Sequence, residues 1–255
     1  MAEVKKYELT DETIKLGIHI LHRIRALRDV CEAGVKAGDL GGWIEKEDNL
    51  SQEDGCWVFP DAKVYDSAEV WGDAQIYDHA TVCGHALIYG SAVIHGYAKI
   101  SGYAQAYDSA EIYGNAVIYG NAMLYEEAKA YGRVQIFNNV IVFGEAEVRD
   151  EAKIYGNAKV FDHARVSGFA RIYGKAEIYE NSRVFGYAQV YDEARIYGNA
   201  MVFDEAKVFD GAQVCDEARV FYDSRVFYHN VVTGIKADEA PSEPPKLDED
   251  PGEWV

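Results

Sequence analysis

A small residue recurs at every sixth position from Ala62 to Ser224, and this short period restricts the possible folds more than any other feature. Alanine fills nearly all of these positions, and Val134, Val140 and Ser182 are the internal exceptions. A valine or isoleucine usually follows two residues later, then an aromatic residue, then glycine or aspartate. Six residues supply only one short strand and one bend, so a fixed period of this length predicts a β-solenoid.

The alternation of side chains along a strand assigns the inner and outer faces of each unit. The small residue and the aliphatic residue two places later point inward, whereas the residue between them and the aromatic residue point outward. Glycine or aspartate and one further polar residue form the bend, where backbone freedom or local hydrogen bonding is needed. Three units close a triangular coil. The repeats from Cys56 onward therefore predict about ten coils, and a rod on the order of 45 Å long at about 4.8 Å per coil.

Composition divides the chain into three predicted segments: an N-terminal capping segment at 1–55, the repeats at 56–234 and a tail at 235–255. A solenoid end exposes unpaired strand edges, so capping is the expected role of the first segment. The tail is rich in proline and carboxylates, a composition that predicts disorder.

Two stretches of the capping segment carry local signals. The run from Leu9 to Thr13 predicts a turn or cap. The stretch from Ile14 to Val30 fits either an amphipathic helix or a hairpin that turns near Gly17. Its β-branched residues and central glycine favour the hairpin.

The hexapeptide unit resembles that of the left-handed parallel β-helix proteins, and this resemblance implies the handedness. One departure is that an aromatic residue directly follows the aliphatic one, where that family usually places a small or acidic residue. The run V-K-A-G-D-L-G-G-W-I-E from Val35, followed by N-L-S-Q and C-W-V-F, resembles the opening of YdcK-like bacterial and prophage β-helix proteins. A transferase label is often attached to those proteins, but the resemblance brings no catalytic residues with it. The expected fold is all-β: a single-stranded left-handed parallel β-helix with an N-terminal cap and a disordered C-terminal tail.

Charge and cysteine usage restrict the partners and the compartment. A net charge of −18 argues against direct binding to nucleic-acid phosphates and leaves a cationic protein partner open. No apolar run reaches transmembrane length, and the N-terminus lacks the apolar region of a signal peptide, so we expect no membrane association. Cys31, Cys56, Cys83 and Cys215 form neither a C-x-x-C motif nor a dense framework, which predicts reduced thiols in a cytoplasmic protein.

An enzymatic alternative comes from the hexapeptide-repeat acyltransferases, which this chain resembles in its coil. In those enzymes a histidine acts as general base in a cleft between subunits, and a loop that interrupts the coil usually helps to form the cleft. No loop interrupts the repeats of this chain. His79 and His95 are the catalytic candidates, because a spacing of sixteen residues could place them one rung apart beside Tyr77 and Tyr97. Acetyl-CoA is expected as a cofactor only under this alternative, and otherwise no cofactor is predicted.

Sorting the bends by the eighteen-residue coil places a row of carboxylates on one edge of the prism, without lysine or arginine. Stacked carboxylates could hold Ca²⁺, but these lack the dense Asp/Asn spacing of calcium loops, so we predict a solvated edge and no metal. This acidic edge includes Asp73, Asp108, Glu126, Glu127, Glu145, Asp162 and Glu180.

The outward aromatic residues should stack in three ladders, one of which borders an apolar strip on a flat face. Such a strip exceeds what a soluble monomer normally exposes, so we predict a homo-oligomer, dimer or trimer, joined side by side through this face. The expected interface residues are Leu87, Tyr89, Met123, Tyr125, Ile141 and Phe143.

The favoured function is that of a non-enzymatic rigid scaffold or protein-binding module that associates with itself. One alternative is an acyltransferase-like enzyme with a site between subunits. The other is an acidic phage or prophage inhibitor that mimics nucleic acid towards a basic partner.

Overall fold

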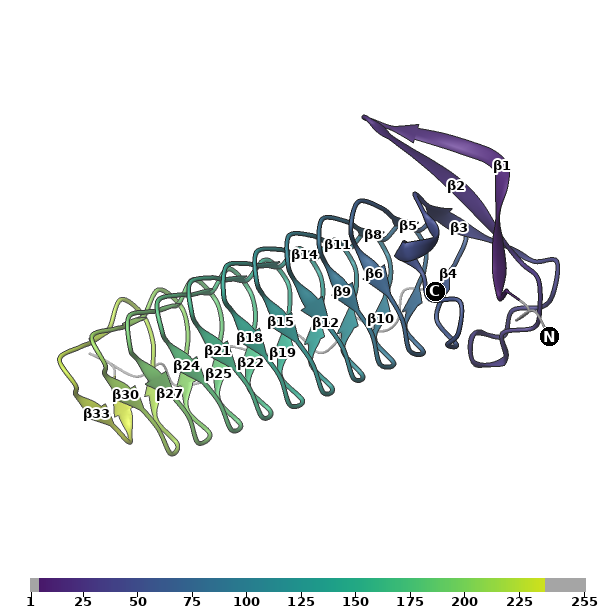
Figure 1. Ribbon diagram of the computed structural model, residues 1–255. Coiled ribbons are helices and arrows are strands. Elements are labelled where there is room, and N and C mark those ends of the chain that lie inside the picture. Colours follow the sequence, from purple (N-terminus) through teal and green to yellow (C-terminus); the bar gives the residue numbers. More distant parts are fainter. Residues whose placement is uncertain (1–4, 237–255) are drawn as a thin grey trace.

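The computed structural model describes residues 5–236, which form a long parallel β-solenoid with an antiparallel hairpin at its N-terminal end (Figure 1). Residues 1–4 and 237–255 lie outside the described residues, and with them most of the predicted acidic tail. The predicted all-β parallel solenoid with an N-terminal cap is confirmed. Between residues 5 and 236, no helix combines the length and the apolar character that a membrane span requires.

Each coil contributes one two-residue strand to each of three parallel sheets, named I, II and III in chain order. Sheet I contains β4 (Trp57–Val58), β7 (Gln75–Ile76), β10 (Val93–Ile94), β13 (Glu111–Ile112), β16 (Lys129–Ala130), β19 (Glu147–Val148), β22 (Arg165–Val166), β25 (Arg183–Val184), β28 (Met201–Val202), β31 (Arg219–Val220) and β34 (Ile235–Lys236). Sheet II contains, among the repeats, β5 (Lys63–Val64), β8 (Thr81–Val82), β11 (Lys99–Ile100), β14 (Val117–Ile118), β17 (Gln135–Ile136), β20 (Lys153–Ile154), β23 (Arg171–Ile172), β26 (Gln189–Val190), β29 (Lys207–Val208) and β32 (Arg225–Val226). Sheet III contains β6 (Glu69–Val70), β9 (Leu87–Ile88), β12 (Gln105–Ala106), β15 (Met123–Leu124), β18 (Ile141–Val142), β21 (Lys159–Val160), β24 (Glu177–Ile178), β27 (Arg195–Ile196), β30 (Gln213–Val214) and β33 (Val231–Val232).

The core is the narrow interior of this prism, and it follows the predicted inward positions. The alanine and the aliphatic residue of each unit are fully buried, as in Ala116 and Ile118. Even Ala106 and Ala130, which replace the aliphatic residue, have no exposed surface. The backbone between the two inward residues bonds to the next coil, for example from the Lys99 amide to the Ala116 carbonyl at 2.8 Å. The predicted assignment of inner and outer faces is therefore confirmed.

The backbone geometry of the bends explains why one repeat position holds glycine in some units and aspartate in others. This residue has a positive φ, 69° at Gly102 and 59° at Asp66. A Cβ at Gly102 would lie only 2.9 Å from the amide nitrogen of Gly120 in the next coil. Where aspartate replaces glycine, its carboxylate can accept a hydrogen bond from the amide eighteen residues later, as Asp66 does from Gly84 at 3.1 Å. Many bend carboxylates thus satisfy backbone amides that the sheets leave unpaired.

The capping segment begins with the antiparallel pair β1 (Tyr7–Leu16) and β2 (His19–Ala26), which turns at Gly17 and Ile18. The hairpin interpretation is therefore confirmed, and the helix alternative is wrong. The predicted turn at Leu9 to Thr13 is also wrong, because this run lies within β1 and forms an irregularity in the register of the strand pair.

Three further elements connect the hairpin to the coils: η1 (Cys31–Ala33), β3 (Leu40–Ile44) and η2 (Glu47–Asn49). Strand β3 pairs antiparallel with β2 and parallel with β5, so the cap extends sheet II. In Figure 1 the hairpin stands at the first coils and projects away from the rod.

Two buried residues at the start of the chain fasten the cap to the first coil. The Lys6 ammonium donates to the carbonyl oxygens of Asp54 and Cys56, at 2.8 and 2.9 Å, and lies 3.2 Å from the Cys56 sulfur. The Tyr7 hydroxyl donates to the Leu50 carbonyl at 2.7 Å. Burial lowers the pKa of Lys6, although these partners favour its charged form. Lys6 and Tyr7 thus cover the apolar end of the prism while their own polar atoms are hydrogen-bonded.

Candidate functional site

The structure brings the six predicted interface residues onto one face, along sheet III. Leu87 pairs with Gln105, Gln105 with Met123, and Met123 with Ile141, so these outward side chains occupy four successive rungs. Each of the three apolar members is half-buried in the single chain. They form a nearly continuous apolar row, which Gln105 alone interrupts.

An aromatic ladder runs beside this row. Tyr89, Tyr107, Tyr125 and Phe143 stack with centroid separations of 4.7 to 5.2 Å and interplanar angles of at most 4°. Burial among its neighbours raises the pKa of Tyr107 to about 12, so its hydroxyl stays protonated at neutral pH. Because each ring face covers the next ring, the ladder presents mainly ring edges to a partner.

The two catalytic candidates stand in different stacks. His79 stacks on Tyr97 and His95 on Tyr113, each with a centroid separation of 4.8 Å. His95 also lies near Asp78, with 3.9 Å between its Nδ1 and the carboxylate. Each imidazole is therefore a member of a ladder at the bend between sheets I and II.

The acidic edge lies at the bends between sheets III and I, opposite sheet II. A shallow hollow along it is lined by Glu126, Glu127, Glu145, Asp162 and Glu180 together with His163. Asp73 and Asp108 occupy bends of earlier coils in the same sequence phase. Part of this edge is structural, because the Glu126 carboxylate accepts the Gly144 amide at 2.8 Å and that of Asp162 accepts the Glu180 amide at 3.2 Å.

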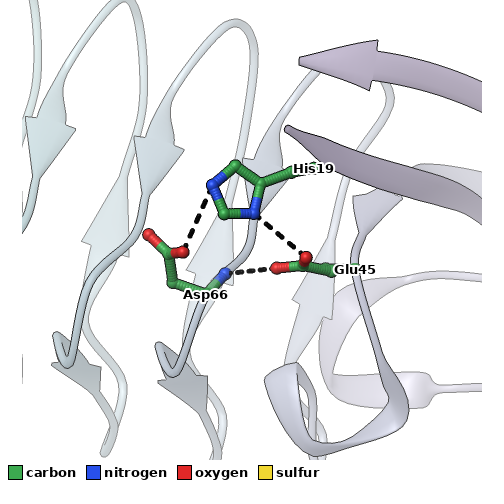
Figure 2. Close-up of side chains that lie close together, drawn as sticks. All are labelled: His19, Glu45 and Asp66. Carbon is green, nitrogen blue, oxygen red and sulfur yellow. Dashed lines mark hydrogen bonds and ion pairs between the residues drawn. The ribbon is translucent and has the colours of Figure 1, made fainter. Parts of the chain in front are cut away.

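A second cluster lies where the cap meets the first coils, and Figure 2 shows its three side chains converging. His19 comes from the start of β2, Glu45 follows β3, and Asp66 lies in the bend after β5. The His19 Nδ1 is 3.0 Å from a Glu45 oxygen and its Nε2 is 3.3 Å from an Asp66 oxygen. The Asp66 amide donates to the other Glu45 oxygen at 2.7 Å. The ring of Tyr65 packs against His19 at 4.9 Å.

The electrostatics of this cluster favour a charged imidazole. The hydrogen bond to Glu45, aided by the nearby Asp66 carboxylate, raises the pKa of His19. Burial acts to raise the pKa of Glu45, but the hydrogen bonds from His19 and the Asp66 amide outweigh it and lower that pKa. The three side chains offer metal-ligand atoms within 4.8 Å of one another. Since both ring nitrogens face carboxylates, however, the arrangement suits a doubly protonated histidine better than a metal ion.

Sequence reasoning left His19 unassigned and missed Glu45 and Asp66 as its partners. Asp66 follows the repeat phase and reads as an ordinary bend residue. Glu45 closes the run quoted for the YdcK resemblance. No periodic signal relates either carboxylate to a histidine in the hairpin, since the contact depends on how the hairpin docks.

Comparison with known proteins bears on the repeats. Residues 82–96 and 194–206 match the family model described as the YdcK beta solenoid repeat. The first matched segment begins at the last residue of β8 and runs through β9 and β10, so it touches all three sheets, and the second contains β27 and β28. A search of curated proteins found no match. The chain therefore carries the YdcK β-solenoid repeat, in agreement with the resemblance that its sequence predicts.

Proposed function

We propose that this protein is a rigid, non-enzymatic scaffold or protein-binding module that associates with itself, as a dimer or trimer, through sheet III. The observation that carries the proposal is the apolar row Leu87, Met123 and Ile141, which lies within four successive strands of sheet III beside stacked aromatic rings. Aromatic residues and methionine are enriched at the cores of protein interfaces. A flat face that pairs with its own copy about a symmetry axis closes the assembly.

The same sheet also supplies a polar boundary to the proposed contact. Further along, the outward positions hold Lys159, Glu177 and Arg195, and both cations lie 3.3 Å from the Glu177 carboxylate. These exposed or half-buried ion pairs resemble an interface rim, where charged groups remain in contact with water. The proposed contact is therefore centred on β9 to β18 and ends near β21.

The test is the pair of substitutions Met123→Glu and Ile141→Glu. Two buried, unpaired carboxylates at the centre of the contact should reduce the assembly to single chains in light scattering, because desolvating them is unfavourable. The matched control is Val93→Glu with Met201→Glu, which places the same charges at half-buried outward positions of sheet I.

A wild-type protein that is monomeric at high concentration would contradict self-association. So would an assembly that both pairs of substitutions leave unchanged, or one that the control disrupts equally. An acyltransferase would instead bind acetyl-CoA in calorimetry, with an affinity that His79→Ala or His95→Ala abolishes.

A further inference from the structure

Sheet II differs from the other sheets in the charge of its outward strand residues. Among β5 to β32 these residues include six cations and no carboxylate, although the chain as a whole has a net charge of −18. We define the cationic strip as the five successive outward residues of β20 to β32. They are Lys153, Arg171, Gln189, Lys207 and Arg225.

The cations of this strip lack the ion-pair partners that several cations on the other sheets have. On sheet III, Lys159 and Arg195 pair with Glu177, and on sheet I, Lys129 pairs with Glu111 at 3.1 Å. Within residues 5–236, no carboxylate lies within ion-pair distance of the four strip cations.

The strip also places like charges directly opposite one another. Lys153 and Arg171 are register partners on neighbouring strands, and so are Lys207 and Arg225. Like charges in such positions destabilise a sheet. An anionic partner would remove this repulsion, so the strip is suited to bind negative charge.

A groove accompanies the strip at the bend between sheets I and II. It encloses about 290 Å³ and is lined by Lys153, Arg171 and Gln189, with Glu151 and the stacked rings of Phe169 and Tyr187. The two rings remain 46% and 59% exposed. Glu151 is already paired with Arg133 at 3.2 Å, so the strip cations stay available to a partner.

The spacing of the charges selects the kind of partner. The strip repeats once per rung, at about 4.8 Å, whereas an extended peptide presents side chains on one side at about 6.6 Å. Duplex DNA carries one phosphate on each strand per about 3.4 Å of helix axis. A second solenoid edge matches the strip rung for rung, and this chain has such an edge at Glu127, Glu145, Asp162 and Glu180.

We propose that the cationic strip of one copy binds the acidic edge of a second copy. The edge lies opposite sheet II, so a copy that offers its edge to one neighbour keeps its own strip free for another. Such a heterologous contact is open-ended. Both surfaces are charged and their side chains are exposed or half-buried, so salt should weaken the contact by screening. This contact is independent of the one proposed for sheet III, which is apolar and should resist salt.

The test uses charge reversal in the Met123→Glu, Ile141→Glu background, so that failure of the sheet III contact cannot affect it. The strip variant carries Lys153→Glu and Arg171→Glu, and the edge variant carries Glu127→Lys and Glu145→Lys. Sedimentation at about 0.02 M and about 0.5 M salt separates screened from unscreened association. The background protein should form large species at low salt only, and each variant alone should lose them.

Combining all four reversals in one chain should restore the large species, because the strip and the edge then exchange sign. The matched control is Arg183→Glu with Arg219→Glu on sheet I, which changes the net charge as the strip variant does and should keep the association. Melting curves verify that each variant is folded.

Three results would overturn the proposal: no salt-sensitive species in the background protein, loss in the control equal to that in the strip variant, or no recovery in the fourfold variant. Polyglutamate that binds the strip of a chain showing no self-association would likewise assign the strip to a different occupant.

Discussion

At the scale of single residues, the solenoid depends on what fits beside a bend inside a narrow prism. Ala116 is fully buried, and its carbonyl accepts the Lys99 amide of the preceding coil at 2.8 Å. Each coil lies one strand spacing from the next, so a larger side chain here can expand in no direction without separating two coils. Alanine therefore recurs at this position because the space beside each bend holds only a small side chain.

We expect Ala116→Leu to lower the free energy of unfolding by about 1–3 kcal/mol, because the added carbons overpack the coil. Lys153→Gln, at a half-buried outward position, should change it by less than about 0.5 kcal/mol. Denaturant unfolding of the two variants measures both values. Equal midpoints would mean that the inward and outward faces are wrongly assigned.

At the scale of elements, the hairpin β1–β2 is held by its pairing with β3, by its buried residues Tyr7, Leu21 and Ile24, and by a few polar contacts. His19 connects it to Glu45 and Asp66, which belong to the linker and to a bend of the first coils. Both partners favour the imidazolium, so the pKa of His19 is raised in the folded protein. The docking of the cap therefore depends on pH.

The direction of this pH dependence follows from the linkage between protonation of His19 and folding. Because the pKa of His19 is higher in the folded protein than its unfolded value of about 6.5, the cluster stabilises the fold fully below about pH 6.5. This stabilisation is lost as pH rises through the folded-state pKa. We expect hydrogen exchange in β1 and β2 to accelerate over that range, beyond the intrinsic effect of pH, in the wild type and not in His19→Gln. A variant that keeps the full wild-type pH dependence would show that another group controls it.

At the scale of the whole molecule, the two ends of the rod are unequal. The N-terminal end is covered by the cap, where Tyr7 and Trp57 are buried and their rings meet edge to face at 6.3 Å. Near the other end of the described residues, Tyr228 is 74% exposed and Val231 57% exposed. A solenoid is stabilised by contacts between neighbouring repeats, so its end coils are the least supported.

We expect amide protection to fall towards the C-terminal coils and to stay high at the first coils. Hydrogen exchange read by mass spectrometry should show β30 to β33 exchanging first and β7 to β15 last. Replacing Tyr7 with alanine should lower protection of β4 and β5, because the hydroxyl contact to Leu50 and the packing on Trp57 are lost. Symmetric fraying of the wild type, or first coils insensitive to this change, would contradict the capping role.

The sequence by itself determined the coil. The alanine period defined the interior, the aromatic period defined the ladders, and the eighteen-residue phase placed Leu87, Met123 and Ile141 on one face. These features are readable because in a solenoid each residue contacts others at a fixed separation along the chain. The position of the cationic strip also follows from the sequence, because Lys153, Arg171, Lys207 and Arg225 are separated by multiples of eighteen residues.

Only the tertiary structure decided the rest. The run from Leu9 to Thr13 became part of a strand because β2 pairs with both of its ends, Leu9 and Thr13. Lys6 was drawn into the end of the prism, and His19 met Glu45 and Asp66 across segments without any period. Such contacts depend on how a non-repeating cap docks on the rod, and no pattern in the chain encodes that orientation. Whether the cations of sheet II had partners likewise depended on where the carboxylates of neighbouring bends pointed.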